Sequence, residues 1–234
     1  MTLAAMTAVA VIGTIALIVS RTNATPSGAY LAFLGGLSLW AWHEMSYFLG
    51  FVTGPRPRGC PPGETRMRQF LYGVQASLWH ELAVVVTAAA LLWLTAGQPN
   101  PIGAWTFMVL WLMRWSAKLN IFLGVRNLHQ EFWPEHLRYL GSYVGRRAAN
   151  ALFPLSILAA TAGVAWLIGH ALSPLGGDFE RTGGLLIATL LVLAALEHVF
   201  LVIRVPDGLL WRLATEPAGK AATVNVELGA GPGS

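Results

Sequence analysis

The sequence predicts an all-α membrane protein, a polytopic bundle of about six transmembrane helices with a cytoplasmic interfacial helix. Of its 234 residues, 55% are hydrophobic and only 11% are charged, whereas a soluble domain carries about 25% charged residues. Most of the charged residues also lie between long apolar runs. Only helices or closed barrels satisfy their backbone hydrogen bonds in lipid, and runs of this length exclude strands.

Six apolar runs account for the six helices. They cover residues 2–20, 28–54, 69–96, 101–125, 151–172 and 184–203. Each has about 20 residues or more, which at about 1.5 Å per residue crosses a hydrocarbon core of about 30 Å. The link 97–100 is so short that the third and fourth helices must form an antiparallel hairpin. Residues 1–211 are therefore interpreted as a single transmembrane domain.

The distribution of basic residues predicts the orientation. Eleven of them lie in segments 55–68 and 126–150 and in the chain beyond 203, whereas the opposite loops carry Arg21 and Arg181. The positive-inside rule places the eleven, and both termini, in the cytoplasm. The tail 212–234 turns to small and polar residues and is predicted to be disordered. The net charge of +4 is spread over short loops, so it does not indicate binding to nucleic acid.

One cytoplasmic segment, 126–150, is predicted to contain more than a loop. Pro134 stands where a helix tolerates its missing N–H group, at an early position. Leu137, Leu140 and Val144 then recur at spacings i, i+3 and i+7. This pattern is typical of an amphipathic helix that lies in the interface of the membrane.

Ionisable residues interrupt four of the apolar runs. We interpret them as one intramembrane polar layer, which consists of His43, Glu44, His80, Glu81, Arg114, Lys118, Asn120, Glu197 and His198. A charged group at a helix centre costs about 2.5–3.5 kcal/mol on insertion scales, so such groups are expected to meet partners. In the predicted helices, His43, His80 and Arg114 each lie about eleven residues, or roughly 16 Å, from the cytoplasmic end. Candidates to cap the layer from the cytoplasm are Glu131, Glu135 and His136.

The first interpretation of this layer is a network of salt bridges and hydrogen bonds that fixes helix packing. Arg114 and Lys118 stand at i and i+4, so they share one helix face. That face is expected to point at three carboxylates, those of Glu44, Glu81 and Glu197. Asn120 is expected to form hydrogen bonds between helices. A buried network of this kind specifies an arrangement more than it stabilises it.

A metal site is the second interpretation. Three histidines and three glutamates supply the ligand types of a di-iron or di-manganese carboxylate centre. The six residues are His43, Glu44, His80, Glu81, Glu197 and His198. Two features argue against a metal. Each His–Glu pair is adjacent, so its members diverge by about 100° around the helix, and the nearby Arg and Lys would repel a cation.

Pigment binding is the third interpretation. A histidine on a membrane helix can ligate the magnesium of a bacteriochlorophyll, and a small residue four positions earlier makes room for the ring. His80 and His198 follow Ala76 and Ala194 at that spacing, and His43 is a further candidate. Flat apolar surface for a macrocycle is expected from Trp42, Trp79, Trp111 and Trp115.

Motifs of the common enzyme classes are absent from the sequence. It contains no Walker-type loop, no His-Glu-x-x-His, no Cys-x-x-Cys, no nucleophile elbow and no histidine boxes of the membrane desaturase kind. A single cysteine, Cys60, excludes an internal disulfide. No catalytic residue is assigned, and a non-enzymatic protein is favoured.

The same polar segments carry a resemblance to a known family. They read WHEMS at 42–46, GFVTGP at 50–55, HELA at 80–83, GAWTF at 103–107, RWSAKLNIFLGV at 114–125, EFWPEHLRYL at 131–140 and LEHVFL at 196–201. In these segments the chain resembles the PuhE family, and the resemblance extends over most of residues 28–211.

The resemblance implies a role that the residues alone do not indicate. It implies a photosynthetic complex assembly protein of an anoxygenic phototrophic bacterium, located in the inner, intracytoplasmic membrane. The family is associated with genes for the reaction centre H subunit and for bacteriochlorophyll synthesis, so subunits of the reaction centre and core antenna are the expected partners. Two alternatives stay open: a membrane metalloenzyme acting on a pigment or carotenoid, and a resident structural subunit of the photosynthetic complex.

Overall fold

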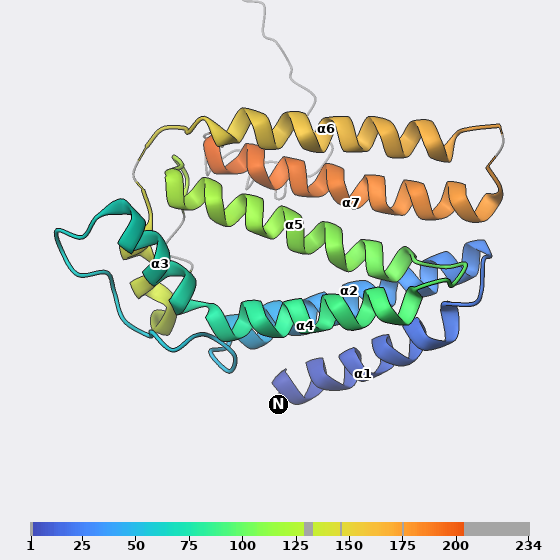
Figure 1. Ribbon diagram of the computed structural model, residues 1–234, viewed down its shortest axis with the longest axis horizontal. Coiled ribbons are helices and arrows are strands. Elements are labelled where there is room, and N and C mark those ends of the chain that lie inside the picture. Colours follow the sequence, from blue (N-terminus) through green and yellow to red (C-terminus); the bar gives the residue numbers. More distant parts are fainter. Residues whose placement is uncertain (1, 129–132, 146, 175, 204–234) are drawn as a thin grey trace, which may run out of the picture. The chain divides into compact units, whose positions relative to one another are not determined.

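The computed structural model describes residues 2–128, 133–145, 147–174 and 176–203, and within them the fold is helical without strands (Figure 1). The helices are α1 (Thr2–Ser20), α2 (Pro26–Phe48), α3 (Arg66–Ala76), α4 (Leu78–Thr95), α5 (Ile102–Leu123), the 3₁₀ helix η2 (Glu135–Tyr143), α6 (Leu152–Ala171) and α7 (Asp178–Val202). The predicted all-α class is confirmed. The predicted tail 212–234 lies outside the described residues.

Within the described residues, four helices are long and apolar enough to cross a membrane, namely α1, α4, α6 and α7. The chain is therefore a membrane protein. Two further helices have the length without the hydropathy, because α2, with 23 residues, carries His43 and Glu44, and α5, with 22 residues, carries Arg114 and Lys118. The count of six spans and the cytoplasmic location of the termini remain predictions.

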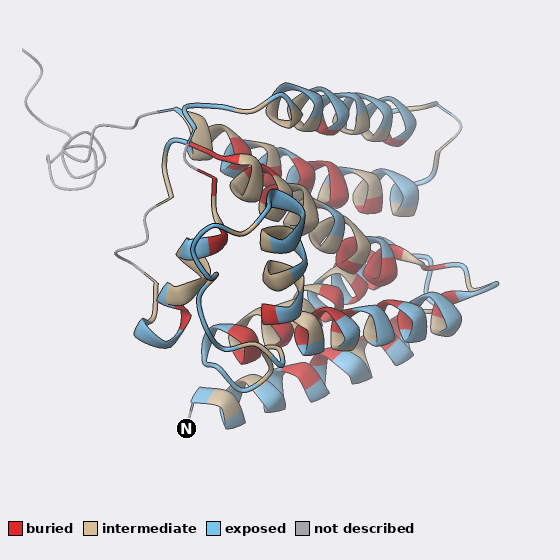
Figure 2. Ribbon diagram, turned by 60° about the vertical axis from the view of Figure 1, so that its left-hand side comes forward, coloured by how far each residue is buried: buried red, intermediate tan, exposed pale blue. Residues whose placement is uncertain are grey.

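The helices α2 and α5 lie at the centre of the described bundle. The contacts of α2 are with α1, α4, α5 and α7, and those of α5 are with α2, α4, α6 and α7. By contrast, α1 packs mainly on α2 and α6 mainly on α7, and both leave most of their surface uncovered (Figure 2). The polar residues of α2 and α5 are thus placed where other helices can surround them.

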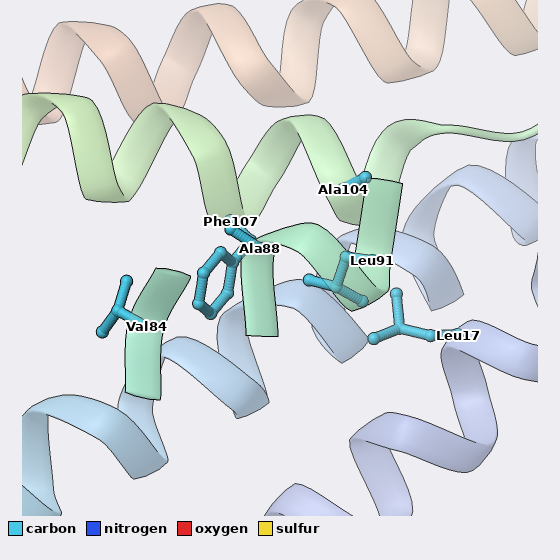
Figure 3. Close-up of a cluster of buried hydrophobic side chains, with 6 residues drawn as sticks. All are labelled: Leu17, Val84, Ala88, Leu91, Ala104 and Phe107. Carbon is cyan, nitrogen blue, oxygen red and sulfur yellow. The ribbon is translucent and has the colours of Figure 1, made fainter. Parts of the chain in front are cut away.

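Small residues let α1, α2 and α5 approach closely, as is common between membrane helices. A Cβ atom on Gly103 would lie 2.1 Å from Leu17 Cδ2, and one on Gly36 would lie 2.5 Å from the Gly103 carbonyl oxygen. Beside this contact, apolar side chains of α1, α4 and α5 form a buried cluster (Figure 3). Its members are Leu17, Val84, Ala88, Leu91, Ala104 and Phe107.

Asn100 links the start of α5 to the region between α1 and α2 by hydrogen bonds. Its amide nitrogen donates to the carbonyl oxygens of Ser20, Asn23 and Gly28 at 3.0–3.1 Å, and its Oδ1 accepts from the backbone N–H of Ile102. Ser20 is the last residue of α1, Asn23 lies in the turn that follows, and Gly28 is in the first turn of α2. One side chain thereby connects the start of α5 to the first two helices.

The structure divides the predicted helix 69–96 into α3 and α4, with the break at Ser77. The cause is a tertiary contact with Gly54, where a Cβ atom would lie 2.1 Å from the Gln75 carbonyl oxygen. Beside it, the Thr53 carbonyl accepts from the backbone N–H of His80 at 3.0 Å. His80 is consequently the third residue of α4.

The predicted depth is therefore wrong for the polar residues of α2 and α4. The helix α2 ends at Phe48 rather than near 54, and Gly50 follows with a φ of 81°. His43 lies five residues before that end, which is roughly 8 Å instead of roughly 16 Å. The polar residues of α2 and α4 thus lie close to the helix ends.

The segment predicted as an interfacial α-helix is η2, a 3₁₀ helix. Leu137 is buried, and Leu140 and Val144 line a cavity with it. The apolar face of this segment therefore contacts protein. An interfacial position for η2 remains a prediction.

Candidate functional site

Two ion pairs join three helices at the ends that carry the polar residues. Lys118 of α5 pairs with Glu81 of α4, and Arg114 Nη2 of α5 lies 3.1 Å from Glu44 Oε2 of α2. We call Glu44, Glu81, Arg114 and Lys118 the charged quartet. His80 adjoins it, with Nε2 3.7 Å from Glu44 Oε1, which is too long for a hydrogen bond.

Local helix geometry places each member of the charged quartet. Arg114 and Lys118 are one turn apart on α5 and share a face, as expected from their spacing. Glu81 stands in the first turn of α4, where the positive end of the helix dipole favours a carboxylate. Glu44 lies four residues before the end of α2. The structure thus brings together four of the predicted site residues.

The two histidines nearest the charged quartet lie in the protein interior. His43 is 4% exposed and His80 is 1% exposed. His43 Nε2 lies 2.9 Å from the Thr87 hydroxyl, and the His80 ring packs on Tyr47 with centroids 4.8 Å apart. Neither Nδ1 atom has a hydrogen-bond partner among the described residues.

His198 belongs to a second cluster on another face of α5. Its Nδ1–H donates to the Ala194 carbonyl at 2.8 Å, and its Nε2 lies 2.9 Å from the Ser116 hydroxyl. Ser116 contacts the Ser156 hydroxyl of α6 at 3.0 Å, and Asn120 Nδ2 donates to the same hydroxyl at 3.0 Å. We call Ser116, Asn120, Ser156 and His198 the hydroxyl cluster.

The prediction of one polar layer is therefore wrong for the α7 residues. Ser116 and Lys118 are two positions apart on α5, which turns their side chains about 200° from each other. His198 meets the Ser116 face, and the adjacent Glu197 is exposed without an ion pair to any described residue. The carboxylates that face Arg114 and Lys118 are two, not the expected three.

The histidines and glutamates do not assemble the metal ligand set. Nowhere in the described ranges do three or more His, Cys, Asp or Glu side chains gather as a metal site requires. Glu44 and Glu81 face cations instead. The predicted set of His43, Glu44, His80, Glu81, Glu197 and His198 is divided among the charged quartet, the hydroxyl cluster and the surface.

The three pigment-ligand candidates are all buried. His198 is 0% exposed and both of its ring nitrogens have protein partners. Among the four predicted tryptophans, Trp115 lines the cavity that Leu137 and Leu140 also line, Trp79 is exposed, and Trp42 Nε1 donates to the Thr7 hydroxyl at 3.1 Å. Trp111 Nε1 is buried and has no partner in the described structure.

Among the cap candidates, His136 has a clear contact. Its Nε2–H donates to the Phe48 carbonyl at the end of α2, at 3.1 Å. Glu135 is exposed, and Glu131 lies outside the described residues. His136 thus attaches η2 to the helix that carries Glu44.

A cavity of about 360 Å³ adjoins the charged quartet. Glu81, Arg114 and Lys118 form part of its wall, and α3, α5 and η2 supply mostly apolar and aromatic side chains. Examples are Phe70, Trp115, Phe122, Leu137 and Leu140, and Trp133, which precedes η2, adds another aromatic side chain. Sequence reasoning missed this cavity and the contribution of α3. The apolar spacing along η2 was a signal for the cavity, but in the sequence alone this spacing is equally typical of a helix that contacts the membrane.

Several buried polar atoms near the charged quartet lack hydrogen-bond partners. Within the described chain these atoms are His43 Nδ1, Glu44 Oε1, His80 Nδ1, Trp111 Nε1, Arg114 Nε and Asn120 Oδ1. Four of the six belong to the charged quartet or to the two histidines nearest it, whereas Asn120 is in the hydroxyl cluster and Trp111 lies near the middle of α5. Buried polar groups usually have partners, so this concentration marks the region as a binding-site candidate.

Comparison with known proteins supplies a family. A family model described as a protein of unknown function, DUF3623, matches residues 1–222. A relative from Rhodobacter capsulatus, described as an uncharacterized 30.4 kDa protein in the puhA 5′ region, is 38% identical over 203 residues, which cover 85% of this chain and 72% of the relative. No solved structure matches the chain. The chain therefore belongs to the DUF3623 family.

Proposed function

We propose that the protein is an integral membrane factor for assembly of the bacterial photosynthetic reaction centre–core antenna complex. The observation that carries the proposal is the relative from the puhA 5′ region, which is 38% identical over 85% of this chain. The resemblance to the PuhE family in the segments around the charged quartet supports the same role. In this proposal the protein resides in the inner, intracytoplasmic membrane with both termini in the cytoplasm.

The uncovered outer helices fit a protein that contacts other membrane helices. Of the most apolar part of α6, only 6% is buried. Leu155, Leu158 and Trp166 of this helix are 59%, 65% and 67% exposed. Such side chains can lie against lipid or against a helix of a reaction centre or antenna subunit with little rearrangement.

Handling of bacteriochlorophyll is a finer part of the proposal. Because His43, His80 and His198 are buried, pigment would contact outer apolar surface rather than a histidine ligand. Trp79 on α4 is 53% exposed and offers one such surface. The contact would be transient, which suits a factor that acts during assembly.

Deletion of the gene in its phototrophic host tests the assembly role. We expect the near-infrared absorption of the assembled complex to fall, while the pigment precursors extracted from the cells stay at wild-type levels. Reintroducing the wild-type gene on a plasmid should restore the complex. Accumulation of a biosynthetic precursor in the deletion strain would contradict the proposal and indicate an enzyme of pigment synthesis.

Purification of the finished complex separates the assembly role from that of a resident subunit. An assembly factor should be enriched with partly assembled intermediates and be depleted from the mature complex. A fixed stoichiometry in the mature complex, measured by quantitative mass spectrometry, would instead show a permanent structural subunit.

A further inference from the structure

The cavity beside the charged quartet has the size and composition of a small-molecule site. Its volume of about 360 Å³ falls within the range of ligand pockets, about 300–1,000 Å³. Phe70 and Val74 of α3 line it on one side, and Leu137 and Leu140 of η2 line it on another. A few polar groups among predominantly apolar walls are typical of sites that fix the orientation of an apolar ligand.

The charged quartet at the polar end of the cavity has a net formal charge of zero. Lys118 is paired with Glu81 and Arg114 with Glu44, so two cations face two carboxylates. An anionic ligand would leave one charge in excess in a largely buried region, which is costly. A neutral ligand leaves both ion pairs intact.

Both cations nevertheless keep hydrogen-bond donors to spare. An arginine carries five N–H donors and a lysine three. Arg114 contacts Glu44 through Nη2, and its side chain, which is 30% exposed, lines the cavity. Lys118 gives one hydrogen bond to Glu81. The ligand head that fits this end is therefore a hydrogen-bond acceptor.

We infer that this cavity binds a neutral, lipid-soluble molecule with a carbonyl head, such as a quinone or an ester-bearing lipid. The carbonyl oxygen accepts from Lys118 or Arg114, and the apolar body lies along Phe70, Phe122 and Leu137. The site is separate from the outer helix faces that the assembly proposal assigns to partner helices, so either proposal can fail without the other.

The test measures binding of a decyl-substituted benzoquinone to the purified full-length protein in phosphatidylcholine vesicles. Trp115 and Trp133 line the cavity, so bound quinone should quench tryptophan fluorescence along a saturable curve. Methyl decanoate, a neutral ester of similar length, should compete and reverse the quenching. Linear, unsaturable quenching of the wild-type protein would overturn the inference.

Filling the cavity supplies a matched set of variants at Gly73. A Cβ atom there would lie 3.8 Å from Tyr143 Cβ, an ordinary contact, so Gly73→Ala should fold and bind as the wild type does. Gly73→Leu extends into the cavity and should weaken binding by about tenfold or more, which corresponds to about 1.4 kcal/mol. Gly169→Leu, on α6 with no atom within 4 Å of the new Cβ, controls for added apolar surface. Equal quenching in Gly73→Leu and the wild type would overturn the inference.

Two further competitors test the chemistry of the head. Decanoate carries a negative charge, and an alkane of equal length has no acceptor at all. If decanoate competes better than methyl decanoate, the head is anionic and the inference is wrong. If the alkane competes as well as the ester, the cations take no part in binding and the inference is likewise wrong.

Discussion

The charged quartet and the hydroxyl cluster are two solutions to the same problem on opposite faces of α5. Each holds polar side chains inside an apolar bundle. In the hydroxyl cluster, His198 uses both ring nitrogens and joins α7 to α5, while Asn120 and Ser156 extend the link to α6. In the charged quartet the ion pairs are formed, yet Arg114 Nε and Glu44 Oε1 stay without partners among the described residues.

The two clusters differ in the kind of polar interaction they contain, and this difference indicates a separate role for each. Hydrogen bonds between uncharged groups hold helices together at modest net gain, about 0.5–1.5 kcal/mol each. Buried ion pairs often gain little over apolar packing, because desolvation offsets their attraction. The hydroxyl cluster leaves one buried acceptor, Asn120 Oδ1, without a partner among the described residues but does not line the cavity, whereas Glu81, Arg114 and Lys118 of the charged quartet line it. The first cluster suits helix packing, and the second also suits a ligand.

The largest effect is expected from Lys118→Met. The Glu81 side chain is only 10% exposed, and removing its partner leaves a buried charge, which costs about 3–5 kcal/mol. The free energy of unfolding, measured by denaturant titration of the protein in mild detergent, should fall by that amount. The double variant Glu81→Leu/Lys118→Met removes both charges and should recover most of the loss. A single variant as stable as the wild type would show that the pair lies in water rather than in the bundle.

The next effect is expected from Gly54→Ala, which acts on one cluster alone. The new Cβ would lie 2.1 Å from the Gln75 carbonyl and 2.6 Å from the Ala76 carbonyl carbon. The backbone must shift where α3 meets α4, and overpacking of this kind costs about 1–3 kcal/mol. Because Glu81 and His80 follow that junction, quinone quenching should weaken as well. Gly169→Ala, with open space around its new Cβ, should leave both stability and quenching unchanged or slightly improve stability. If Gly54→Ala had the same free energy of unfolding as the wild type, the segment around Gly54 would not pack against the end of α3.

A smaller effect is expected from His198→Leu in the hydroxyl cluster. The substitution introduces an apolar side chain of similar size and removes the two hydrogen bonds to Ala194 and Ser116, at a cost of about 1–2 kcal/mol. Quinone quenching should not change, because His198 does not line the cavity. Ser156→Ala provides a milder test on the neighbouring helix. A loss of quenching in His198→Leu without unfolding would show that the two clusters are coupled and would break the comparison.

Hydropathy and charge alone predicted much of this arrangement. The apolar run 151–172 corresponds to α6 at Leu152–Ala171 within one residue at each end, because lipid-facing helices require uninterrupted apolar length. The pairing of Arg114 and Lys118 with Glu44 and Glu81 followed from their i, i+4 spacing and from the cost of unpaired buried charge. Hydropathy and residue spacing are sufficient to predict features that depend on one helix and its surrounding lipid or water.

Tertiary contacts account for the rest. The break at Ser77 depends on Gly54, which lies more than twenty residues earlier in the chain. The separation of His198 from the charged quartet depends on how α7 is rotated, and a nearly uniform apolar helix gives no sign of its rotation. Residues of α2, α3, α4, α5, η2 and α7 line the cavity, so no single stretch of sequence predicts it.

The smallest effect is expected from Arg68→Ala, which supplies the baseline for both clusters. Arg68 Nη1 lies 3.4 Å from Glu64 Oε2, but the arginine side chain is 65% exposed. Exposed ion pairs contribute about 0–1 kcal/mol, because water and salt screen them. The free energy of unfolding should therefore change by less than about 0.5 kcal/mol, and raising the salt concentration should reduce even that change. If Arg68→Ala lowered the free energy of unfolding as much as Lys118→Met does, charge pairing alone, without burial, would explain the effect of Lys118→Met. A change near zero would instead show that the effect of Lys118→Met depends on burial. Burial is the property that distinguishes the charged quartet from the pair that the exposed Arg68 forms with Glu64.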